Sequence, residues 1–125
     1  MSKRTGIKYE GELKEILEEN GFYVVRAAGS HGIDLVAIDR NNTAYLIEVK
    51  SSDTRKRKLN GREVKQLSYL KSLAKQGYNV LIALRILRSV QWYIADINKI
   101  DTSSVLSANK MHSLAFFLTM RNITH

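Results

Sequence analysis

Two acidic residues and one lysine are spaced so that they can meet on neighbouring strands of a sheet. Glu48 and Lys50 lie in the apolar stretch AYLIEVK, where alternation along a strand points both to one face. Asp34 lies in the stretch IDLVAI, and the short connection between the two stretches predicts a hairpin that brings Asp34 beside Glu48. Two carboxylates and a lysine at one sheet edge suit phosphodiester hydrolysis. The carboxylates hold Mg²⁺, which activates a water, and the lysine orients or deprotonates that water or stabilises the transition state.

A third carboxylate, Glu10, is expected to reach the same place from the first predicted helix. It lies three and seven residues before Leu13 and Leu17 and so borders the apolar stripe of that helix, whereas Glu12 is expected to face solvent. Structural alternatives remain for each residue. Glu10 can form a surface pair with Lys14, and Glu48 can form an ion pair with Lys50 that neutralises charge on an apolar strand.

The elements that must position these residues follow the order α-β-β-β-α-β-β-α. Gly21 and Gly77 end the first two helices, and Asn60 with Glu63 forms a box-like cap at the start of the second. The apolar series from Val105 to Leu118 predicts the last helix. Helices are predicted at 6–20, 61–76 and 104–120, and strands at 22–28, 33–38, 44–51, 79–87 and 90–97. This order predicts a single α/β domain with a central mixed sheet flanked by helices.

Charge and composition narrow the class of protein. The chain has 125 residues, with 20 Lys and Arg against 12 Asp and Glu, for a net charge of +8. Such an excess of positive charge indicates a polyanionic partner, most often nucleic acid. Cysteine is absent, which excludes disulfides, thiolate catalysis and cysteine-ligated zinc. No apolar run approaches roughly 20 residues and no signal-type apolar core is found, so we expect a cytoplasmic, reducing, nucleoid-associated protein without membrane contact.

The positive charge is concentrated in the middle of the chain. Segment 52–59 is predicted to be a mobile basic loop, because its four adjacent bases, Arg55, Lys56, Arg57 and Lys58, repel each other until phosphates neutralise them. Residues 1–5, with Lys3 and Arg4, are predicted to form a flexible basic tail of the same kind. The alternative is that both segments are only solvated runs of charge.

The order and spacing of four motifs resemble those of the archaeal Holliday-junction resolvases, within the PD-(D/E)XK nuclease superfamily. The resemblance covers about residues 6–97, and its motifs are Gly6-x-x-x-Glu10, Gly21-Phe22-x-Val24-Val25-Arg26, Ala28-Gly29-Ser30-x-x-x-Asp34-Leu35-Val36 and Ile47-Glu48-Val49-Lys50. It implies a restriction-endonuclease-like fold for a single nuclease domain at 1–125. One departure is Gly11, where the family often has a basic residue directly after the helix-one glutamate.

The resemblance also implies a role for each matching residue. Glu10, Asp34 and Glu48 match the metal-binding carboxylates, and Lys50 matches the catalytic lysine. Ser30 matches a loop serine that approaches the scissile phosphate. Arg26 matches a basic residue that binds DNA at the site. The full set expected to contact DNA is Lys3, Arg4, Arg26, Arg55, Lys56, Arg57, Lys58 and Arg62.

The activity implied is resolution of four-way DNA junctions by paired, metal-dependent cuts in recombination and repair. Mg²⁺ is the expected metal, with Mn²⁺ able to substitute, and no small-molecule cofactor is expected. Because a junction is two-fold symmetric, we expect a homodimer, for which apolar residues of the last helix such as Phe116 provide a surface. The alternatives are a related nuclease that cuts another DNA structure and a non-enzymatic basic DNA-binding protein.

Overall fold

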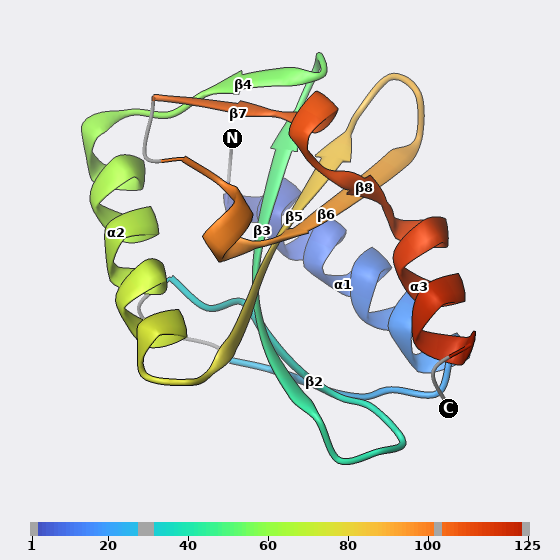
Figure 1. Cartoon of the computed structure of the whole chain (residues 1–125). Coiled ribbons are helices and arrows are strands. Elements are labelled where there is room, and N and C mark those ends of the chain that lie inside the picture. Colours follow the sequence, from blue (N-terminus) through green and yellow to red (C-terminus); the bar gives the residue numbers. More distant parts are fainter. Residues whose placement is uncertain (1–2, 28–31, 102–103, 124–125) are drawn as a thin grey trace.

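A computed structural model of the chain describes residues 3–27, 32–101 and 104–123. Figure 1 shows helices packed around a central sheet. The helices are α1 (Lys3–Glu19), α2 (Gly61–Lys75) and α3 (Leu114–Ile123), with short 3-10 turns η1 (Ile97–Lys99) and η2 (Ala108–Lys110). The strands are β1 (Tyr23–Arg26), β2 (Leu35–Ile38), β3 (Ala44–Ser52), β4 (Lys56–Lys58), β5 (Asn79–Ile86), β6 (Gln91–Asp96), β7 (Val105–Ser107) and β8 (His112–Ser113).

The main sheet has six strands in the order β1-β2-β3-β5-β6-β8. Among the strand pairs that the structure describes in this sheet, only β3–β5 is parallel, so the sheet is mixed, as the sequence predicts. The predicted hairpin between β2 and β3 is present. Its turn is closed by Asp39, whose backbone N–H donates to Thr43 O at 3.0 Å and whose Oδ1 accepts from Asn41 N and Thr43 N. These local bonds fix the register that places Leu35 opposite Ile47.

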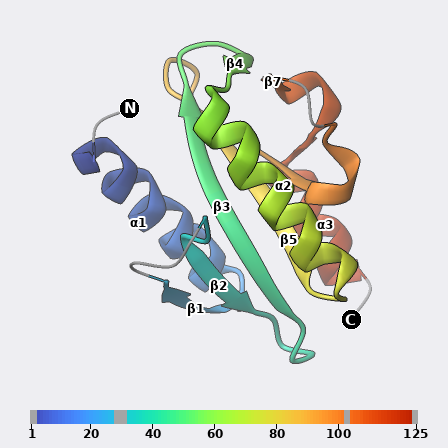
Figure 2. The same cartoon turned by 90° about the vertical axis from the view of Figure 1, so that its left-hand side faces the viewer.

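Helices cover both faces of the sheet, and alternation along β5 shows how the two cores form. Leu81 and Ala83 pack with α1 and α3, whereas Val80 and Ile82 pack with α2. Figure 2 shows α1 and α2 on opposite sides of β3. The β3 segment that carries the charged residues therefore passes between these two helices. Within the described ranges, no helix is both long and apolar enough to cross a membrane.

Three boundaries predicted from the sequence are wrong. The helix predicted at 104–120 begins at Leu114, because residues 105–113 form β7, η2 and β8 instead. Segment 52–59 is not simply a loop, since β4 pairs with β7 in an antiparallel ribbon that places Arg57 opposite Leu106. Helix α1 begins at Lys3, so the predicted tail at 1–5 is helical from its third residue.

Candidate active site

The site forms where β2 begins beside β3. Asp34 immediately precedes β2 rather than lying on it, and its backbone N–H donates to Ile47 O at 2.9 Å. The Asp34 side chain continues the strand pairing with β3 beyond the backbone, since Val49 N–H donates to Asp34 Oδ2 at 2.7 Å. A carboxylate thus replaces the next backbone acceptor along the edge of β3. This bond fixes Asp34 next to the part of β3 that carries Glu48.

Glu48 and Lys50 lie side by side on the face of β3 that points towards α2. Both residues are buried, at 4% and 8% exposure, and Lys50 Nζ lies 3.2 Å from Glu48 Oε1. Burial raises the pKa of Glu48 to about 8 against the opposing charge of Lys50, and the charge of Asp34 adds a smaller upward contribution. The alternation predicted for this strand is confirmed, and so is the proximity of Asp34.

Glu10 approaches the same cluster from α1. It is half-buried, and burial together with the charge of Asp34 raises its pKa, while Arg26 acts in the opposite direction. Asp34 therefore has a neighbouring glutamate on each side, one from α1 and one from β3. The three carboxylates that the sequence grouped are brought together around Asp34.

Helix α1 is tied to the sheet by Glu12, the next acidic residue after Glu10. The prediction that Glu12 faces solvent is wrong. Its Oε1 accepts from Arg85 Nε at 2.7 Å and from Trp92 Nε1 at 2.8 Å, and Arg85 is a buried residue of β5. This anchor holds the segment of α1 that carries Glu10 against the sheet.

Arg26 lies over the glycine that departs from the family pattern. A Cβ atom built on Gly11 would lie 2.6 Å from Arg26 Nη2, so the guanidinium occupies the space where a side chain at residue 11 begins. Arg26 Nη2 also donates to Ile7 O at 3.2 Å. Because Arg26 is exposed and acts electrostatically on Glu10, it supplies positive charge at the edge of the cluster.

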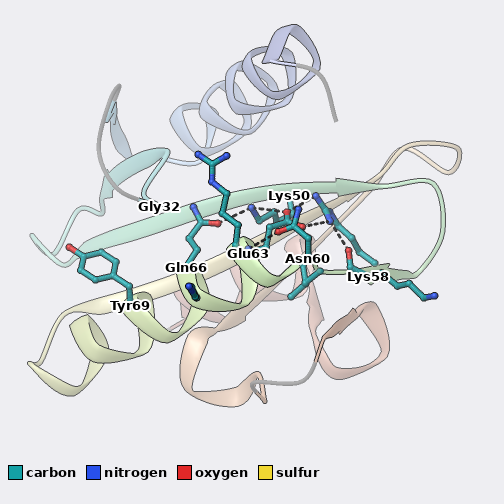
Figure 3. A pocket seen from close by; sticks show the side chains of 11 residues that line it. Gly32, Lys50, Lys58, Asn60, Glu63, Gln66 and Tyr69 are labelled. Atoms are coloured by element: carbon teal, nitrogen blue, oxygen red, sulfur yellow. Dashed lines mark hydrogen bonds and ion pairs between the residues drawn. The ribbon is translucent and has the colours of Figure 1, made fainter.

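Two residues of α2 hold Lys50, and sequence reasoning missed both contacts. Lys50 Nζ lies 3.3 Å from Glu63 Oε2 and donates to Gln66 Oε1 at 3.0 Å, while Gln66 Nε2 donates to Glu48 Oε2 at 3.4 Å. Figure 3 shows Lys50, Glu63 and Gln66 meeting above α2. The capping box of Asn60 and Glu63 is confirmed, with Glu63 N–H donating to Asn60 Oδ1 at 2.8 Å. Glu63 thus caps α2 and binds the lysine at once.

The basic segment after β3 is more ordered than its charge predicts. Arg57 Nη2 lies 2.8 Å from Glu63 Oε2, and the Arg57 side chain is only 16% exposed. Arg55 stacks on the ring of Tyr93 and donates to Asn109. The picture of four mutually repelling, solvated bases is therefore wrong for these two arginines. Lys56 and Lys58, which follow the two arginines in turn, are exposed, and their contact with phosphates stays a prediction.

Several expected site residues are not placed by the structure. Ser30 lies outside the described residues, and the side chains of Lys3 and Arg4 lie outside the described part of α1. Their roles stay predictions. Arg62 is described, and it lies exposed near the start of α2, on the wall of a pocket that adjoins Lys50.

The carboxylates suit a hard divalent cation in their chemistry. Among the described residues, no group of three or more His, Cys, Asp or Glu side chains is arranged to hold a metal ion as it stands. Mg²⁺ commonly uses one or two carboxylates and keeps several waters, so a closed cage is not required. Asp34 raises the pKa of Glu10 and of Glu48 in addition to the effect of burial, which marks negative charge that a cation would neutralise.

The mixed sheet, its covering helices and the acidic cluster at the start of β2 define a restriction-endonuclease-like domain. A family profile described as archaeal Holliday junction resolvase (Hjc) matches residues 1–116. The chain therefore belongs to the archaeal Holliday junction resolvase family.

Individual relatives agree with this assignment. A crossover junction endodeoxyribonuclease Hjc from Methanocaldococcus jannaschii is 41% identical over 64 residues, which are 51% of this chain and 47% of the relative. The match thus spans about half the length of that relative. The solved structure of Hjc from Archaeoglobus fulgidus, a Holliday junction resolvase, has a TM-score of 0.71 at 23% identity and covers 92% of this chain and 96% of its own. At that identity it supports the fold.

Proposed function

We propose that this protein is an endonuclease that resolves four-way DNA junctions by metal-dependent hydrolysis of the phosphodiester backbone. The observation that carries the proposal is the convergence of Asp34, Glu48 and Lys50 at one sheet edge, in a chain of the resolvase family. Two carboxylates and an ammonium group at one point are what this hydrolysis requires. The chain's net charge of +8 suits a DNA substrate.

The residues divide the chemistry among them. A bound magnesium ion would supply a polarised phosphate oxygen and a water of lowered pKa. Asp34 and Glu48 would hold it, and Glu10 would complete the set from α1. A water oxygen bonds to phosphorus as one P–O ester bond breaks. Lys50, next to Glu48, stabilises the negative charge that develops on the attacked phosphate.

Two copies of the chain would act on one junction. A four-way junction has approximate two-fold symmetry, and a C2 dimer presents two identical sites at a fixed separation. Helix α3 offers an apolar surface for such a dimer, because Phe116 and Met120 are 48% and 44% exposed. We therefore extend the proposal to a homodimer, with Mg²⁺ as metal and Mn²⁺ able to replace it.

Cleavage of a synthetic four-way junction beside a duplex of matched sequence tests the activity. With Mg²⁺ we expect cuts in the junction and none in the duplex, and with EDTA no cuts in either. Asp34→Asn should bind the junction and fail to cut it, because it removes one carboxylate without changing size. Asp53→Asn, at an exposed residue after β3, is the matched control and should cut normally.

The outcomes separate the alternatives. Equal cutting of junction and duplex would indicate a related nuclease with another substrate. Binding without metal-dependent cutting would indicate a non-enzymatic DNA-binding protein. On a supercoiled plasmid that extrudes a cruciform, a dimer should make both cuts in one encounter and yield linear DNA, whereas a monomer should yield nicked circles.

A further inference from the structure

A pocket of about 1020 Å³ opens directly beside Lys50, between β3 and the outer face of α2. Its volume lies at the upper end of the range for small-molecule and cofactor sites. Figure 3 shows its labelled side chains in a row along α2, from Lys58 at one end to Tyr69 at the other, with Lys50 and Gln66 between them. The carboxylate chemistry proposed above uses only the part of this region next to Lys50. The proposed hydrolysis assigns no ligand to the rest of the pocket.

The lining of the pocket is strongly positive. Among the described residues that line it, five are basic and one is acidic: Lys50, Arg57, Lys58, Arg62, Lys65 and Glu63. The single acid does not repel an anion, because Glu63 is paired with Lys50 at 3.3 Å and with Arg57 at 2.8 Å. Arg62 and Lys65 are exposed and face the pocket from α2. This lining is suited to bind phosphate groups.

One aromatic ring completes the pocket. Arg62, Lys65, Gln66 and Tyr69 follow each other at helical spacing, so they share one face of α2. Tyr69 is 46% exposed and belongs to neither buried core, so packing does not account for its position. A single exposed aromatic residue needs no explanation by itself. An exposed ring on the wall of a cationic pocket is the combination that binds a nucleic-acid strand through its bases and its backbone.

We propose that this pocket binds the DNA strand next to the cleaved bond, with one unpaired base stacked on Tyr69 and adjacent phosphates on Arg62 and Lys65. Bases inside a duplex have both faces covered by their neighbours, so only a base released from its pair can lie flat on the ring. Gln66 contacts Lys50, and Tyr69 follows it by three residues, about 4.5 Å along the helix axis. The proposed stacked base therefore lies less than one helical turn along α2 from the residue that contacts Lys50.

The position of the pocket gives it a part in substrate selection. Cleavage of a bond beside the pocket rests on the proposed nuclease function, whereas binding of an unpaired strand in the pocket does not. A strand whose bases open easily at a branch point can enter the pocket, and a strand held in a continuous duplex cannot. Tyr69 is thereby assigned a role in choosing distorted over regular DNA.

The test measures binding of a fluorescently labelled oligothymidylate by anisotropy, in EDTA, so that no catalysis is required. Tyr69→Ala should weaken binding by about 5- to 150-fold, the range found when one stacking ring is removed. Tyr69→Phe keeps the ring and should bind as the wild type does. Tyr78→Ala is the matched control, since Tyr78 is also exposed, at 56%, and does not line the pocket.

Three results would overturn the pocket proposal: wild-type protein that does not bind the oligonucleotide, Tyr69→Ala that binds as tightly as wild type, or an equal loss with Tyr78→Ala. Melting curves confirm that each variant is folded. Failure of the proposed function is detected by a different measurement, the junction-cleavage assay, in which the wild type would not cut the junction in Mg²⁺. Junction cleavage together with unchanged binding by Tyr69→Ala would reject the pocket alone.

Discussion

At the scale of single residues, some contacts of the site can be predicted from the alternation of residues along a strand, and others cannot. The proximity of Asp34, Glu48 and Lys50 could be predicted, because alternation on one strand and a short hairpin are local properties of the sequence. The bonds from Glu63 and Gln66 to Lys50 could not, because they depend on how α2 docks against the sheet. The sequence identifies Glu63 only as part of a helix cap, since a capping box depends on residues that are neighbours in the sequence.

Lys50 gives the sharpest residue-scale prediction. In Lys50→Ala, Glu48 keeps its contact with Gln66, and Glu63 keeps Arg57 and Asn60. We therefore expect the free energy of unfolding to fall by about 2 kcal/mol or less. Single-turnover cleavage should fall by about 10²- to 10³-fold, because a charge contact to the transition state is lost. Junction affinity should change little.

A purely structural role for Lys50 would give the opposite pattern. Loss of one partner of a buried ion pair typically costs about 3–5 kcal/mol, with cleavage retained by the protein that remains folded. Thermal melts run beside cleavage assays distinguish the two cases. Lys75→Ala, at an exposed position in the last turn of α2 and outside the pocket, is the matched control for loss of a lysine.

At the scale of elements, the region after β3 and the region before α3 were predicted wrongly for one shared reason. β4 and β7 are three residues each, and they exist because they pair with each other across about two fifths of the chain. Sequence periodicity carries no information on such a pairing. Val105, Ala108 and Met111 resemble a helical stripe, yet Leu106 is fully buried and Val105 is 37% exposed. An extended chain is what places Leu106 and Ala108 together in the core.

Helix α1 depends on its anchor to hold Glu10 in the site. Glu12→Ala leaves the buried guanidinium of Arg85 and the indole N–H of Trp92 without this acceptor. We expect the free energy of unfolding to fall by about 3 kcal/mol, and cleavage to fall as Glu10 shifts. Glu15→Ala, at an exposed position on the same helix, should change neither. In a double-mutant cycle, Glu12→Ala with Arg85→Met should cost less than the sum of the two single changes; simple additivity would contradict the anchor.

At the scale of the whole molecule, an acidic site lies within a protein whose net charge is strongly positive. The chain is +8 overall, yet the acidic groups Glu10, Asp34 and Glu48 gather at one site, where their mutual repulsion and their burial disfavour the charged form. The positive groups attract DNA phosphates to a place where carboxylates would repel them. A divalent cation resolves this conflict, because it neutralises the carboxylates and binds the phosphate. DNA binding, metal binding and folding are therefore linked through one buried carboxyl group, that of Glu48.

The pH dependence of stability tests this linkage. The pKa of Glu48 rises from its ordinary value of 4.5 to about 8 in the folded, metal-free protein. Between these pH values the folded state holds a proton on Glu48 that the unfolded state has lost. Stability from this group is thus fully present at low pH and falls as pH rises towards 8. Glu48→Gln removes this dependence, so in EDTA the melting temperature of wild type relative to Glu48→Gln should decline from pH 5 to pH 8.

Mg²⁺ should reverse the decline in the wild type alone. Metal binding requires the carboxylate form, so it must displace the proton from Glu48 below about pH 8, and affinity for Mg²⁺ should rise with pH up to that value. The stabilisation that saturating Mg²⁺ gives to wild type should accordingly grow from pH 6 to pH 8, as bound ligand shifts the folding equilibrium. Glu48→Gln should show little stabilisation at any pH. Parallel melting curves for the two proteins, with and without Mg²⁺, would show that Glu48 neither titrates in this range nor holds the ion.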